Sequence, residues 1–176
     1  MSEQRDASDA AAEYRRHFDQ FYLGVIPRIL TEEGMFLAFV SMIAAIESLA
    51  GICMPDRGTG ERFRAFIETY FPTAYESYTE QLWQFRNRMV HAFNPTPFII
   101  VCHQSRMHLC DANGITILNA EDFYADLISA SRAYFTALYA DVALQTCFSR
   151  RLSLDDGGRP ISHQVVESVT RGDEAP

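Results

Sequence analysis

The sequence predicts a mainly α-helical protein, a bundle of four to five helices with a small antiparallel β-hairpin before the last long helix. Three observations lead to this prediction. Apolar residues recur at helical spacings of three and four over much of the chain. The uncharged run from Gly34 to Ile46 is typical of a helix buried at the centre of a core. Asn113-Gly114, between two short apolar runs, is a strong signal for a hairpin turn.

The chain of 176 residues has the size of a single domain, and its 48% hydrophobic and 22% charged residues are an ordinary globular balance. We expect a flexible leader over residues 1–11, one helical domain over 12–154 and a flexible tail over 155–176. The formal net charge of −8 argues against a broad, non-specific nucleic-acid surface, which is normally basic. A small basic site on an acidic protein remains compatible with it.

The first half of the chain contains three predicted helices. The first runs from about Ala11 to Val25, on a stripe of aromatic and aliphatic residues at steps of three and four. The second is capped by Thr31 and runs to about Ala50. A shorter helix follows from about Glu61 to Tyr70 and ends before Pro72, because proline disfavours a helical residue ahead of it.

The next helix begins with a capping-box pattern, in which Thr73 is the N-cap and Glu76 stands three residues later. We expect it to reach about Ala92, where Asn94-Pro95-Thr96-Pro97 ends it. Its core-facing residues alternate at steps of three and four: Tyr75, Tyr78, Leu82, Phe85, Met89 and Ala92. Trp83, Asn87, Val90 and His91 form a second face, which we expect another helix or a partner subunit to cover.

Short strands are predicted over Phe98–Cys102, Met107–Cys110 and Ile115–Leu118. Asn119 can cap the last long helix, which we expect from about Glu121 to Phe148. Zinc ligands could in principle come from this region, from Cys102, His103, His108 and Cys110. Strand alternation would place the adjacent Cys102 and His103 on opposite faces, so we expect no metal and no cofactor.

The four cysteines form no C-x-x-C pair, and the polar start MSEQRDASDA lacks the apolar core of a signal peptide. We therefore expect reduced thiols and a cytoplasmic location. The uncharged run from Gly34 to Ile46 is shorter than the roughly 20 apolar residues of a spanning helix, so no membrane association is expected.

The residues most suited to chemistry are Arg86, Asn87, Arg88 and His91. Asn87 and His91 are four residues apart and are therefore neighbours on a helix, and both arginines are long enough to approach them. Arginine suits phosphate binding, histidine transfers protons near neutral pH, and asparagine can orient either group. Together these groups suit cleavage of a phosphodiester without a metal, by attack of the RNA 2′-hydroxyl on its own phosphate.

Arg86-Asn87-x-x-x-His91 resembles the R-x4–6-H motif of HEPN domains, which lies late on a long helix of a small helical bundle. Many such domains are metal-independent endoribonucleases of toxin, defence or RNA-processing systems, and they dimerise so that two motifs face one groove. The resemblance implies catalytic roles for Arg86 and His91, a supporting role for Asn87 and RNA binding by Arg88. It also implies a homodimer, an RNA substrate, and an antitoxin or regulatory protein as partner.

Other interpretations of the same residues stay open from sequence. His91 could interact with the C-terminal end of its own helix dipole, and Arg86 could form a salt bridge to a glutamate on a neighbouring helix. Glu47, isolated in an apolar helix, could pair with Arg86 or Arg88. The alternative function is a catalytically silent HEPN-like binding or scaffold module for a nucleotide or a protein partner.

Overall fold

The computed structural model describes residues 2–54 and 56–156. The α-helices in this part of the chain are α1 (Ser2–Phe18), α2 (Met35–Cys53), α3 (Thr59–Tyr70), α4 (Thr79–Ala92), α5 (Ala120–Ala140) and α6 (Val142–Asp156). A small sheet of β1 (Phe98–Val101), β2 (Asp111–Ala112) and β3 (Ile115–Asn119) precedes the last two helices. The predicted mainly helical fold is therefore confirmed.

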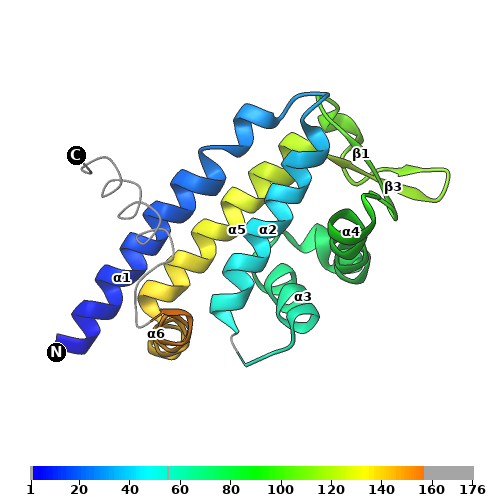
Figure 1. Cartoon of the computed structure of the whole chain (residues 1–176). Helices are drawn as coiled ribbons and strands as arrows, with labels where there is room; N and C mark the ends of the chain where they lie inside the picture. The colour runs from blue at the N-terminus through cyan, green and yellow to red at the C-terminus, as the bar shows by residue number, and fades with distance from the viewer. Residues whose placement is uncertain (1, 55, 157–176) are drawn as a thin grey trace, which may run out of the picture.

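The three longest helices, α1, α5 and α2, run side by side in one layer (Figure 1). Helices α3 and α4 lie against the α2 side of this layer, and α6 lies across the end of α5. Helix α2 is the central helix that its composition predicts, since it contacts α3, α4, α5 and α6. Four of its large apolar side chains, Phe39, Met42, Ile43 and Ile46, are fully buried.

By length and composition α2 could also cross a membrane, since its most apolar stretch of 18 residues has a mean hydropathy of 2.1. Within the described structure 61% of that stretch is buried inside the fold. A core helix has the same property, because its apolar side chains are removed from water by the rest of the bundle.

The last helical segment is two helices rather than one, so the described chain has six α-helices instead of four to five. Asp141 separates α5 from α6 with an extended backbone, φ −111° and ψ 114°. Its carboxylate accepts the amide hydrogens of Ala143 at 2.7 Å and Leu144 at 3.4 Å, which makes it the N-cap of α6. The predicted single helix from Glu121 to Phe148 was wrong because this aspartate competes with the helical backbone.

The structure describes the predicted N-terminal leader but only the first two residues of the predicted C-terminal tail. Helix α1 begins at Ser2 rather than at about Ala11, so the start predicted for the first helix was wrong and most of the predicted leader is helical. The helix gives way at Asp19–Leu23 to a π-helix, in which the Gly24 amide donates to the Asp19 carbonyl at 2.7 Å. The tail predicted for 155–176 lies outside the described residues from 157 onward.

Three predicted caps do not act as expected. Thr31 precedes α2 by a full turn, and its hydroxyl accepts the amide hydrogen of Gly34 instead. Thr73 lies in a 3₁₀-helix (Thr73–Tyr78) that begins after Pro72, so α4 starts only at Thr79. Asn119 does occupy the N-cap position of α5, but its side chain makes no cap hydrogen bond.

The sheet has the order β1-β3-β2 and mixes both strand directions. Strands β2 and β3 form the predicted antiparallel hairpin, and its turn residues Asn113 and Gly114 have φ of 56° and 83°, as a type I′ turn requires. Strand β1 pairs with β3 in parallel, so the prediction of a purely antiparallel element was wrong. The predicted strand Met107–Cys110 is absent because Leu109 adopts a left-handed φ of 57°, which interrupts an extended run.

Candidate functional site

The predicted chemical residues lie at the C-terminal half of α4, where this helix packs against α2. Asn87 and His91 are four residues apart on one face of α4, and the long side chain of Arg86 reaches both of them, from about 140° around the helix in the case of His91. Glu47 of α2 faces them across the interface, 39 residues away in sequence from Arg86. The site is therefore built from one local helical motif and one distant carboxylate.

Arg86 is the centre of this cluster. Its Nη2 lies 2.7 Å and 2.9 Å from the two carboxylate oxygens of Glu47, and its Nη1 donates to Asn87 Oδ1 at 3.0 Å. The side chains of Arg86 and Glu47 are only 15% and 21% exposed. Of the alternatives left open by the sequence, the salt bridge from Arg86 to a glutamate on a neighbouring helix is the one observed.

His91 lies at the solvent-exposed end of the cluster. Its Nε2 is 3.3 Å from Arg86 Nη1. A guanidinium can only donate, so Nε2 accepts this hydrogen bond with its lone pair. Arg86 thus connects the carboxylate of Glu47, the amide of Asn87 and the imidazole of His91 in one continuous network.

Arg88 does not join this network. Its Nη1 donates to the hydroxyl of Thr96, in the segment that follows α4. The approach of Arg88 to His91 that the sequence allowed is not observed. Arg88 is exposed, and its position leaves a cation on the surface beside the end of the helix.

Trp83 is half-buried and packs against α3. Its ring lies 5.7 Å from that of Phe63, and the guanidinium groups of Arg64 and Arg86 lie over it at 5.6 Å and 5.3 Å. Gly60 leaves the space for the indole, since a Cβ atom at this position would lie 2.9 Å from the ring. The second face of α4 is thus covered by α3 at Trp83.

The same face is open to solvent at its other end. Val90 and Phe93 at this end are 46% and 77% exposed, as is Leu37 of α2 at 58%. The ring of Phe93 lies 4.1 Å from that of Phe36 of α2, tilted by 41°. Phe93 has the left-handed φ of 50°, and the Asn94 amide donates to the Arg88 carbonyl at 3.1 Å, which closes the helix with a Schellman-type turn. A large apolar residue is therefore held out of the core beside the cluster.

A second polar cluster was not predicted from sequence. Tyr75, which precedes α4, is buried, and its hydroxyl contacts both His108 Nε2 and Asp126 Oδ2 at 2.8 Å. Burial lowers the pKa of His108 and raises the pKa of Asp126. The sequence carries no local signal for this cluster, because Tyr75 reads as an ordinary core residue and its partners lie 33 and 51 residues away.

The described residues contain no group of three or more histidine, cysteine, aspartate or glutamate side chains that could hold a metal ion. Of the residues considered as zinc ligands, His103 instead pairs with Glu121 at 2.7 Å. His108 faces Tyr75, as described above.

Comparisons with protein-family models, with curated proteins and with solved structures find no match to this chain. Any assignment of function therefore rests on the residues of the Arg86 cluster and on their geometry.

Proposed function

We propose that this chain is a metal-independent endoribonuclease that resembles HEPN domains and acts as a homodimer. The observation that carries the proposal is the contact between Arg86 Nη1 and His91 Nε2 at 3.3 Å, with Asn87 bound to the same guanidinium nitrogen. It joins a permanent cation to an exposed histidine whose Nε2 lone pair accepts a hydrogen bond from that cation. An attacking hydroxyl and a phosphate need these two groups side by side.

In the proposed reaction the RNA 2′-oxygen attacks the adjacent phosphorus while the bond from phosphorus to the 5′-oxygen breaks. His91 accepts the proton of the 2′-hydroxyl, and the guanidinium of Arg86 stabilises the charge that develops on the phosphate oxygens. The leaving 5′-oxygen takes up a proton from the protonated imidazole (imidazolium) of the second subunit's His91, which becomes neutral as the first His91 becomes protonated. The products end in a 2′,3′-cyclic phosphate and a 5′-hydroxyl, and no water or metal is consumed.

The homodimer is supported by the apolar surface beside the cluster. Leu37 lies on α2, Val90 on α4 and Phe93 directly after α4, and all three are exposed. Exposed apolar residues gathered at one place, with polar residues at the border, are typical of association surfaces. A second copy seated there would place two His91 side chains near one groove.

A catalytically silent binding or scaffold module is the second candidate, and one observation favours it. The guanidinium of Arg86 already binds Glu47 at 2.7 Å, which neutralises its charge before any phosphate arrives. For catalysis a phosphate must compete with this carboxylate or bind to the remaining edge of the guanidinium. The two candidates therefore differ in whether Arg86 can serve a ligand.

The deciding experiment is an RNA-cleavage assay in EDTA with wild type and His91→Ala. A mixed-sequence RNA and the same RNA with 2′-O-methyl groups are compared, and product ends are identified by mass. We expect wild type to cleave only the unmodified RNA to 2′,3′-cyclic phosphates, and His91→Ala to lose at least about 100-fold in rate, the usual contribution of a general base.

The matched control is His103→Ala, which removes a histidine that is 63% exposed and lies on the loop before β2. Cleavage that persists in His91→Ala, or that is lost equally in His103→Ala, would contradict the assignment of His91. Absence of cleavage by wild type, together with loss of dimerisation in His91→Ala, would support the scaffold module instead.

A further inference from the structure

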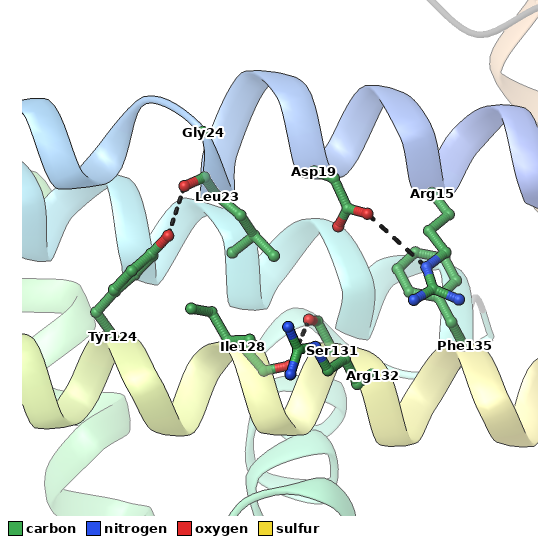
Figure 2. Close-up of a pocket in the computed structure, with 9 residues that line it drawn as sticks. All are labelled: Arg15, Asp19, Leu23, Gly24, Tyr124, Ile128, Ser131, Arg132 and Phe135. Atoms are coloured by element: carbon green, nitrogen blue, oxygen red, sulfur yellow. Dashed lines mark hydrogen bonds and ion pairs between the residues drawn. The ribbon is translucent and has the colours of Figure 1, made fainter.

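A pocket lies between the end of α1 and the middle of α5, on residues that the proposed ribonuclease reaction does not use (Figure 2). Its volume is about 370 Å³, within the range of small-molecule sites. The residues that give it chemical character are Arg15, Asp19, Leu23, Ile128, Arg132 and Phe135. Glu47, Arg86 and His91 do not line it.

The wall on the α1 side is the π-helix Asp19–Leu23. Such short π-helical segments occur often at functional sites, because the wider turn displaces side chains and frees carbonyl groups. Here the carbonyl of Leu23 accepts a hydrogen bond from the Tyr124 hydroxyl of α5 (Figure 2). This bond ties the two walls together at one end, so the pocket is part of the packed structure.

The charges in the pocket favour an anion. The guanidinium of Arg132 is exposed and makes no hydrogen bond or ion pair with any residue that the structure describes. Arg15 is held over the ring of Phe135 at 5.6 Å, and its Nε is 3.8 Å from the carboxylate of Asp19. Two guanidinium groups thus meet a single carboxylate, on a protein whose formal net charge is −8.

Figure 2 shows Arg15 and Asp19 on the α1 side of this space and Arg132 on the facing α5 side. The side chains of Leu23 and Ile128 extend into the gap between the two helices. The pocket therefore combines cations from both walls with an apolar lining.

We propose that this pocket binds a small organic phosphate, with its phosphate group at Arg132 and Arg15 and its apolar body on Leu23 and Ile128. A phosphate dianion carries more negative charge than the single carboxylate of Asp19, and its oxygens suit the forked donors of arginine. The apolar lining contributes where the ligand carries a ring or a short chain, which inorganic phosphate lacks.

The test uses the full chain and phenyl phosphate as the probe, with binding followed by calorimetry and by the NMR amide shifts of Gly24, a lining residue. Arg132→Gln is expected to weaken binding about tenfold or more, the size of a hydrogen bond to a charged group. Asp19→Asn is expected to tighten binding about two- to fivefold, because it removes an exposed like charge. Opposite effects from two substitutions at one pocket are hard to produce by unfolding.

Arg28→Gln is the matched control, since Arg28 is an exposed arginine near the same end of the molecule that does not line the pocket. It is expected to bind phenyl phosphate like wild type. Equal weakening in Arg28→Gln and Arg132→Gln would overturn the proposal, as would the absence of saturable binding to wild type. Inorganic phosphate that binds as tightly as phenyl phosphate would overturn the role of the apolar wall.

Discussion

The hydroxyl of Tyr75 lies 2.8 Å from Nε2 of His108, and this contact joins the loop before the hairpin to the helical core. The other ring nitrogen, Nδ1, accepts the amide hydrogen of Asn119 at 3.1 Å. His108 must therefore be neutral with its proton on Nε2, which donates to Tyr75, while the Tyr75 hydroxyl donates to Asp126 at 2.8 Å. This relay of hydrogen bonds from Asn119 through His108 and Tyr75 to Asp126 links the end of β3 to α5.

This relay predicts that stability depends on His108 at mildly acidic pH. Burial lowers the pKa of His108, so the unfolded chain binds a proton at a higher pH than the folded chain does. The stabilisation that neutral His108 contributes to the folded chain is then fully present above the ordinary histidine pKa of about 6.5. It is lost as pH falls below that value. His108→Gln should reduce this loss, measured as the free energy of unfolding in urea at pH 8 and pH 5.5.

Asp126 acts with the opposite sign. Burial raises its pKa, so protonation of Asp126 favours the folded chain as pH falls toward the ordinary aspartate value of 3.8. The contribution of His108 to the free energy of unfolding is therefore measured between pH 8 and pH 5.5, where histidine rather than aspartate titrates. His103→Gln, at an exposed histidine, is the control; an equal change in its pH dependence would argue against the relay.

The pair of Arg86 and Glu47 should stabilise the packing of α4 on α2. Glu47→Ala leaves a guanidinium that is only 15% exposed without its carboxylate, and we expect it to lower the free energy of unfolding by about 1–3 kcal/mol. The double variant Glu47→Ala/Arg86→Ala should be more stable than the sum of the single changes predicts. Urea denaturation of the four proteins measures this coupling.

The exposed pair of Arg150 and Asp56, with side chains 59% and 62% exposed, is the matched control cycle. Its coupling should lie within about 1 kcal/mol of zero, since solvent screens an exposed pair. A coupling at Arg86 and Glu47 no larger than this one would show that the pair does not hold the two helices together.

Gly60 should be intolerant of a side chain because of Trp83. A Cβ atom at this position would lie 2.9 Å from the indole ring, so Gly60→Ala must displace the ring that Arg64 and Arg86 both contact. We expect a loss of about 1–3 kcal/mol in unfolding free energy, despite the better helix propensity of alanine. Gly58→Ala is the control, since no atom lies within 4 Å of a Cβ there, and thermal unfolding compares the two.

Phe93→Gly should separate association from stability, if the proposed homodimer forms through this surface. Glycine removes the strain of a left-handed φ of 50°, about 1 kcal/mol, and this offsets the lost ring contact with Phe36. We therefore expect unfolding of the monomer to change by less than about 1 kcal/mol, while the dimer weakens in sedimentation equilibrium. Val142→Ser, at a residue 62% exposed on α6, should leave association unchanged; equal weakening would place the interface elsewhere.

The sequence by itself determined the local features. The uncharged apolar run identified α2 as the core helix, and the four-residue spacing placed Asn87 beside His91 on one helix. Asn113-Gly114 identified the hairpin turn, because both residues accept a positive φ. These features depend on backbone geometry over a few residues, and that geometry is determined by the side chains of those same residues.

Only the tertiary structure decided which distant groups meet. Glu47 reaches Arg86, His108 reaches Tyr75, and β1 lies parallel to β3, each through packing of segments far apart in the chain. The pocket at Arg132 likewise needs both α1 and α5, and neither helix shows it alone. Periodicity specifies which face of a helix is buried, but the partner of that face is set by how all the elements fill one core.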